Sequence, residues 1–161
     1  MKRDKLYLDT SIISHLDAPD VPEKMEDTLQ LWEQIRAGKY EIVLSEVVFD
    51  EIDKCFEPKK SLLYAYLAKI QYVHKRSDSA IIALAKKFIQ RDILREKNFD
   101  DCRHIAAALL SGCDAIVSWN FKHIVNIDTI RGTKVITSQE GYSDIIICSP
   151  TMLIKGGLDH E

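Results

Sequence analysis

The sequence predicts an α/β fold with a mainly parallel central sheet flanked by helices. Short apolar or β-branched runs alternate along the chain with longer stretches whose apolar residues recur every three or four positions. Several of the short runs are apolar on both faces, which is typical of parallel strands covered by helices on each side. The length of 161 residues fits one domain with its own core.

The strands are expected where β-branched and apolar residues cluster between turn signals. The first strand, Lys5–Leu8, alternates in polarity and ends at Asp9. Five further strands are expected at 40–44, 72–75, 115–119, 134–137 and 145–148.

The helices are expected between these strands. Pro22 suits the first turn of the first long helix, and Gly38 suits its end. Ser45 and Ser77 are interpreted as N-caps of two later helices. The expected helices span 21–38, 46–56, 59–70, 78–94 and 100–110, the last being rich in alanine.

The composition excludes several classes of protein. The longest apolar run, Ile105–Leu110, is far shorter than the ~20 residues that span a bilayer. The N-terminus lacks the apolar segment of a signal peptide. The four cysteines form no C-x-x-C pair. We therefore expect a cytoplasmic protein with reduced thiols and no membrane partner.

The formal net charge of −3 does not favour binding to nucleic acid over the whole surface, although a local basic patch is compatible with it. Lys87, Arg91 and Arg95 recur at intervals of four residues and are expected along one helix. The default interpretation is a solvated charged face, and the alternative is contact with an RNA backbone.

Four polar residues are expected near the carboxyl ends of strands, where open parallel sheets place their functional crevice. Asp9 and Asn120 follow strands, Glu51 lies nearly two helical turns after Ser45, and Asp101 begins the alanine-rich helix. Clustered carboxylates repel one another, and Mg²⁺ or Mn²⁺ relieves that repulsion. Such ions also support phosphodiester hydrolysis.

Each of these four residues also has a purely structural interpretation. Asp9 can cap the turn that follows its strand, and Glu51 can be a solvated helix residue. Asp101 can serve only as a negative charge at a helix N-terminus, and Asn120 can be a turn residue. The functional interpretation therefore depends on all four together.

Four segments resemble the motifs of PIN domains, the fold of VapC-type toxin ribonucleases. Leu-Tyr-Leu-Asp-Thr-Ser-Ile-Ile-Ser at 6–14 resembles the first motif, and Leu-Ser-Glu-Val-Val-Phe-Asp-Glu-Ile at 44–52 the second. Asp-Cys-Arg-His-Ile-Ala-Ala-Ala at 101–108 resembles the third, and Ile-Val-Ser-Trp-Asn-Phe at 116–121 the fourth. The resemblance covers roughly residues 5–150, which leaves a short C-terminal tail on a single PIN-like domain of residues 1–161.

The resemblance implies a metal-dependent endoribonuclease, the toxin of a type II toxin–antitoxin pair. It places Asp9, Glu51 and Asp101 at the acidic positions that hold Mg²⁺ or Mn²⁺. Asn120 matches the fourth position, where Asp is more usual, and its amide brings an oxygen without a charge. The alternative is a degenerate PIN module that binds RNA or protein without cleavage.

The resemblance also implies partners and a sheet order. The expected partners are RNA and a small antitoxin protein, and a second copy of the chain is a further candidate. PIN-like sheets are wound around the first strand, so Lys5–Leu8 should lie near the centre of the sheet. The strand Ile145–Cys148 should lie at or near an edge.

Within the motifs, Asp100 is the rival of Asp101, and Glu46 is the rival of Glu51. The His-Ile-Ala register favours Asp101 over its neighbour. His104 lies one turn after Asp101 and is either a partner of the metal ligands or a buried structural histidine.

Four further residues near the motifs have two interpretations each. Ser11 and Ser118 can bond a metal-bound water or serve as caps. Lys122 can contact a phosphate or lie in a solvated loop. Trp119 can stack on a base or pack in the core.

Two other enzyme classes fit less well. Phosphatases of the haloacid-dehalogenase type have a second Asp two residues after the first, and this chain has Ser11 there. A dinucleotide-binding Rossmann domain is excluded because the chain has no G-x-G-x-x-G motif.

Overall fold

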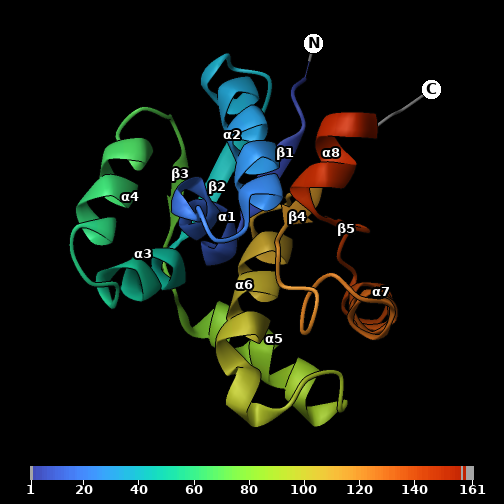
Figure 1. The fold of residues 1–161 in the computed structure, drawn as a ribbon. Helices are drawn as coiled ribbons and strands as arrows, with labels where there is room; N and C mark the ends of the chain where they lie inside the picture. Colours follow the sequence, from blue (N-terminus) through green and yellow to red (C-terminus); the bar gives the residue numbers. More distant parts are fainter. Residues whose placement is uncertain (1, 157, 159–161) are drawn as a thin grey trace.

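The sheet has five strands, all parallel, in the order β3-β2-β1-β4-β5 (Figure 1). The structure is a computed structural model, and it describes residues 2–156 and 158. The α/β class, the central first strand and the edge position of the last strand were predicted and are confirmed. The strands are β1 (Lys5–Leu8), β2 (Glu41–Ser45), β3 (Val73–Lys75), β4 (Ala115–Val117) and β5 (Ile146–Cys148).

The helices lie on both faces of the sheet, and most of the predicted ones are present with shorter ends. In Figure 1, α5 and α6 lie side by side below the sheet, with α3 and α4 to one side and α7 and α8 to the other. The short helical segments are α1 (Thr10–Ser14), η1 (His15–Asp17), η2 (Glu96–Asn98) and α8 (Pro150–Gly156). The longer helices are α2 (Pro22–Arg36), α3 (Glu46–Asp53), α4 (Lys59–Leu67), α5 (Ser79–Gln90), α6 (Phe99–Leu110) and α7 (Ile127–Glu140).

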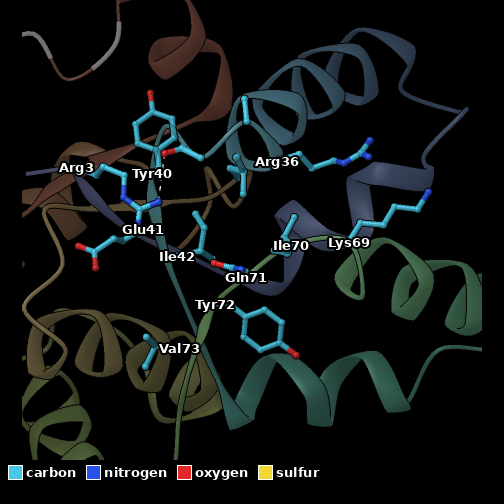
Figure 2. Close-up of a pocket in the computed structure, with 13 residues that line it drawn as sticks. Arg3, Arg36, Tyr40, Glu41, Ile42, Lys69, Ile70, Gln71, Tyr72 and Val73 are labelled. Atoms are coloured by element: carbon cyan, nitrogen blue, oxygen red, sulfur yellow. Dashed lines mark hydrogen bonds between the residues drawn. The ribbon is translucent and has the colours of Figure 1, made fainter.

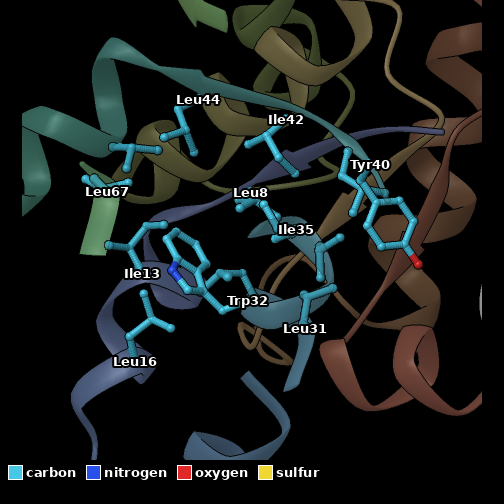
Figure 3. Close-up of a cluster of buried hydrophobic side chains, with 14 of the residues drawn as sticks. Leu8, Ile13, Leu16, Leu31, Trp32, Ile35, Tyr40, Ile42, Leu44 and Leu67 are labelled. Carbon is cyan, nitrogen blue, oxygen red and sulfur yellow. The ribbon is translucent and has the colours of Figure 1, made fainter. Parts of the chain in front are cut away.

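Two apolar clusters hold the helices to the sheet. On one face, Leu6 and Leu8 pack with Trp32 of α2 and with residues of α1, α4 and α8 (Figure 3). On the other face, Tyr7 and Ile116 pack with residues of α5, α6 and α7. Because side chains alternate along a strand, Tyr7 points to the α6 side while its neighbours point away from it.

The predicted strand at 134–137 is wrong, because these residues belong to α7. The Val-Ile-Thr run there is β-branched, which favours a strand in isolation. The buried side chains Thr129, Thr133, Ile136 and Thr137 nevertheless recur at helical spacing. Asn126 caps the start of this helix through its side chain, and Gly141 ends it with φ of 77°.

The predicted ridge of Lys87, Arg91 and Arg95 on one helix is also wrong. Helix α5 is capped by Asp78 rather than Ser77, and it ends at Gln90. Arg91 is its C-cap, and Arg95 lies beyond the helix, immediately before η2. Lys87 forms an ion pair with Glu140 of α7. Of the three cations, only Lys87 is therefore inside a helix.

No helix in the described part of the chain combines the length and the apolar composition that crossing a bilayer requires.

The packing of α7 gives a test of the fold. A Cβ atom at Gly132 would meet Ile93 Cγ2 at 2.5 Å and Cγ1 at 2.7 Å. Gly132→Ala should therefore destabilise the protein by about 1–3 kcal/mol, although Ala is the better helix former. In an Ile93→Ala background, where those atoms are absent, the same change should be neutral or stabilising. Urea unfolding measures both costs, and equal costs in the two backgrounds would contradict this packing.

Candidate active site

Asp9 lies where the central strand passes into α1, and it is 3% exposed. Its Oδ1 accepts hydrogen bonds from Ser11 N at 3.1 Å and Ser11 Oγ at 2.5 Å. Its Oδ2 accepts from Ser118 Oγ at 2.7 Å. Asp9 is thus the N-cap of α1, which agrees with its structural interpretation. The three hydrogen-bond donors also fix the orientation of its carboxylate at the sheet edge.

Glu51 reaches the same edge from α3 and contacts His104 of α6. His104 Nε2 lies 2.7 Å from Glu51 Oε1, and Thr10 Oγ1 donates to that same oxygen at 2.7 Å. On its other side, His104 Nδ1 lies 2.6 Å from Tyr7 Oη, which lies 2.6 Å from Ser45 Oγ. A continuous hydrogen-bonded chain therefore runs from the sheet to Glu51.

That chain explains why Ser45 does not cap α3 through its side chain. Ser45 stands at the N-cap position, as predicted, but its hydroxyl makes no capping hydrogen bond. It bonds instead to Tyr7, which is fully buried under α6. His104 is itself 2% exposed, so it is a buried histidine and a partner of Glu51 at once.

Asp101 and Asn120 contact each other directly. Asn120 Nδ2 donates to Asp101 Oδ1 at 3.2 Å, and Asn120 Oδ1 accepts from the backbone N of His123 at 2.9 Å. The orientation of the amide is fixed, because only its oxygen can accept from a backbone N–H. The Asn120 side chain therefore accepts a hydrogen bond from the backbone of its own loop and donates one to Asp101. From the sequence, its oxygen was predicted as a metal ligand.

The pKa values of the three carboxylates depend on burial and on nearby charges. Burial raises the pKa of Asp9, and the charge of Glu51 raises it further. Burial also raises the pKa of Asp101, to which the charges of Asp9 and Glu51 add. Burial alone would raise the pKa of Glu51, but the hydrogen bond and charge of His104 lower it. The three carboxylates thus lie within electrostatic reach of one another, which destabilises their joint ionisation.

His104 is the shared countercharge of the cluster. Burial would lower its pKa, but the hydrogen bond to Glu51 and the charges of Asp9, Glu51 and Asp101 raise it. Because both ring nitrogens have partners, the ring is held in one orientation. The cationic form can donate from Nε2 to Glu51 and from Nδ1 to Tyr7.

The two rival acids are engaged elsewhere. Glu46 Oε2 accepts from the backbone N of Ser77, two residues after the end of β3. Asp100 pairs with Arg103 at 3.0 Å on the exposed side of α6. The charges that raise the pKa of His104 most are those of Asp9, Glu51 and Asp101.

The cluster fits a hard cation that keeps most of its water. Within residues 2–156 and 158, no three His, Cys, Asp or Glu side chains form a ready-made metal cage. Mg²⁺ does not require one, because it usually binds through one or two carboxylates and several waters. Asp9 is buried and Asp101 is half-buried, and both have raised pKa values, which is the condition that a nearby cation relieves.

Three other predicted residues take different places. Ser11 and Ser118 bond Asp9 directly, so they orient the carboxylate. Lys122 is exposed in the loop after β4. The neighbouring Trp119 is 7% exposed, and its Nε1 donates to Thr28 Oγ1 at 2.8 Å.

Sequence reasoning missed Tyr7 and Thr10, which hold His104 and Glu51. The signal for Tyr7 was its alternation with Leu6 and Leu8, which turns it toward the helix that carries His104. Thr10 gave no signal of its own, because its partner Glu51 is far away in sequence.

Cys102 follows Asp101 on α6 but faces the core. It is fully buried, and burial raises its pKa to about 12. Its sulfur is therefore a neutral thiol packed away from the cluster.

A cavity of about 510 Å³ lies at the opposite, amino ends of β2 and β3 (Figure 2). Its lining includes Tyr40, Glu41 and Tyr72, and Arg3 at its rim donates to Gly38 O at 3.2 Å. None of the predicted site residues lines it. The acidic cluster therefore lies at the other edge of the sheet from this cavity.

The overall structure resembles solved VapC toxins, which are PIN-domain proteins. The first is VapC20 of Mycobacterium tuberculosis, described as a toxin that cleaves the sarcin-ricin loop. It shares 17% sequence identity, with a TM-score of 0.58, over 88% of this chain and 98% of that one. The second is VapBC2 of Rickettsia felis bound to a DNA fragment from its promoter, with 15% identity, a TM-score of 0.55, and coverage of 90% and 98%. At these identities the likeness establishes a shared fold.

No family model and no curated protein matches the sequence.

Burial of Asp9 predicts a pH-dependent gain in stability for Asp9→Asn. Because the folded-state pKa of Asp9 is raised, its ionisation favours the unfolded chain above the unfolded pKa of ~3.9. With a chelator present, Asp9→Asn should therefore melt at a higher temperature than the wild type at pH 7. The difference should shrink as the pH falls toward 4. Thermal melts between pH 4 and 8 measure it.

Asp100→Asn is the matched control, since Asp100 is half exposed and lies outside the cluster. Its effect on the melting temperature should be small at every pH. An Asp9→Asn protein less stable than the wild type at pH 7 would contradict the charge-repulsion account of the site.

Proposed function

We propose that this chain is a metal-dependent endoribonuclease of the PIN-domain type, acting in the cytoplasm as the toxin of a toxin–antitoxin pair. The observation that supports this most is the gathering of Asp9, Glu51 and Asp101 around His104 at the carboxyl ends of the central strands. The fold shared with VapC toxins adds independent support.

Asp9 and Asp101 would hold the ion, Mg²⁺ or Mn²⁺, with Glu51 and Asn120 beside it. When bound, such an ion activates a water molecule and stabilises the leaving oxygen of a phosphodiester. Ser11 and Ser118 orient Asp9 for this role through their hydroxyls. Asn120 orients Asp101 through its amide N–H.

Glu51 would accept a proton from the attacking water. Its lowered pKa keeps it ionised, as a proton acceptor requires. His104 and Thr10 both bond to Oε1, so the proton would go to Oε2. His104 and Tyr7 fix the direction of this carboxylate.

The proposed partners follow from the same fold. RNA is the substrate, and the protein partner is a small antitoxin, which the likeness to VapBC2 from Rickettsia felis supports. We propose that this antitoxin covers the acidic cluster. A second copy of the chain remains a further candidate.

A module that binds RNA or protein without cutting is the second candidate. One observation favours it: both ends of the Asn120 amide are already hydrogen-bonded within the protein. The fourth polar position then serves the scaffold and brings no charge to an ion.

Cleavage assays separate the two candidates. A pool of structured and unstructured RNAs is incubated with the protein while Mn²⁺ is titrated. We expect weak, metal-dependent cleavage by the wild type, and its near-complete loss in Asp101→Asn and Glu51→Gln. Asn120→Ala should cost about 10–100-fold. Asn120→Asp should preserve or raise activity at low Mn²⁺, because it adds a charge for a hard cation.

The neighbouring Asp100→Asn is the matched control and should cleave like the wild type. Cleavage that persists in Asp101→Asn would indicate a contaminating nuclease. Cleavage by Asn120→Asp alone would show that the natural chain has kept the scaffold and lost the reaction.

Metal binding is tested separately by thermal melts with Mn²⁺. An ion that binds only the folded state raises the melting temperature by mass action, by about 2.7 kcal/mol at 100 times its Kd. We expect such a rise for the wild type and none for Asp9→Asn. In Asn120→Asp, a carboxylate replaces the donor to Asp101, so the metal-free protein should be less stable and the rise larger. Equal responses of wild type and Asp9→Asn would exclude these carboxylates as ligands.

A further inference from the structure

An exposed aromatic ring and a lysine stand immediately beside the acidic cluster. We name Lys24, Trp119 and Phe121 the aromatic rim. Lys24 Nζ lies 5.5 Å from the ring centroid of Trp119 and 5.3 Å from that of Phe121. The two rings lie 6.1 Å apart in an edge-to-face arrangement, one on each side of Asn120 in the chain.

The rim is built on the same hydrogen bonds that hold the site. Ser11 Oγ donates to Asp9 and also accepts from the backbone N of Trp119 at 2.8 Å. The Trp119 ring is fixed at its far end by Thr28. Trp119 is therefore a rigid, buried support, whereas Phe121 is 47% exposed and presents its ring to solvent.

Lys24 is an available cation. Its described partners are the two aromatic rings, and no carboxylate in the described part of the chain forms an ion pair with it. Lys87, from the predicted basic ridge, is instead neutralised by Glu140. A polyanion approaching three carboxylates is repelled unless a cation lies nearby, and Lys24 supplies that charge at the rim.

We propose that the aromatic rim binds single-stranded RNA, with one base stacked on Phe121 and an adjacent phosphate at the Lys24 ammonium. This inference rests on the proposed function and deepens it, since it names how the substrate of that site is held. Stacking on an exposed ring accepts any base, so the rim supplies affinity with little dependence on sequence. Its position beside Asn120 and Asp101 would bring the neighbouring phosphodiester to the carboxylates.

The test measures binding and cleavage separately. Fluorescence anisotropy follows a labelled single-stranded RNA of mixed sequence in the presence of a chelator, so that no metal-dependent cleavage occurs. Phe121→Ala and Phe121→Leu should weaken binding roughly fivefold or more. Phe121→Trp should bind at least as well as the wild type because it keeps a stacking face. Lys24→Ala should lower the slope of log affinity against log salt by about 0.7.

Phe56→Ala is the matched control, because Phe56 is 89% exposed and lies in the loop between α3 and α4. It should bind RNA like the wild type, and melts should show that all variants are folded. Equal binding by the wild type, Phe121→Ala and Phe121→Leu would overturn the inference. So would a wild type that binds no RNA, or one that binds duplex RNA as well as single strands.

The two proposals fail in different ways. If the wild type cleaves RNA but Phe121→Ala changes neither its binding nor its KM, the inference falls and the proposed function stands. If RNA binding depends on Phe121 but no metal supports cleavage, the proposed function falls and the inference stands.

Discussion

The arrangement of the site depends on the compensation of buried negative charge by one imidazole. Asp9, Glu51 and Asp101 act on one another, and the charges of all three raise the pKa of His104 against the lowering effect of burial. That ring cannot turn, because Tyr7 holds one nitrogen and Glu51 the other. The position of α6 over the sheet, the orientation of Tyr7 and the unusual role of Ser45 all serve to hold this ring in place.

The sheet order explains how distant parts of the chain reach one ring. With β1 in the centre, its carboxyl end is flanked by those of β2 and β4, which lead into α3 and into the loop that carries Asn120. A parallel sheet places these ends at one edge, so residues that follow β1, β2 and β4 meet there. Helix α6, which packs on the sheet, adds Asp101 and His104. The cavity at the other edge shares none of these residues.

Much of the fold could be predicted because its signals are local. Lys5–Leu8 alternates in polarity, and the alanine-rich helix ends near Gly112, where φ is 65°. The predictions failed where tertiary packing overrode the local preference for a strand. The β-branched Val-Ile-Thr run around residue 136, for example, lies in helix α7. In the cluster, Asp9 was predicted from its place after a strand, Glu51 from its spacing after Ser45, and Asp101 from its place at the start of the alanine-rich helix. The Asn120 amide could not be oriented from sequence, because its partner is a backbone N–H of its own loop.

The buried partners of the cluster also determine which atoms a visiting ion would meet. The two nitrogens of His104 are already bonded, and the sulfur of Cys102 is buried in the core as a neutral thiol. Soft or borderline metals such as Zn²⁺ favour imidazole and thiolate ligands. Neither an unbonded nitrogen of His104 nor a thiolate of Cys102 is available beside the acidic cluster. An ion bound as proposed would therefore be a hard cation rather than Zn²⁺, because the nearby nitrogen donors are bonded and the nearby sulfur is buried.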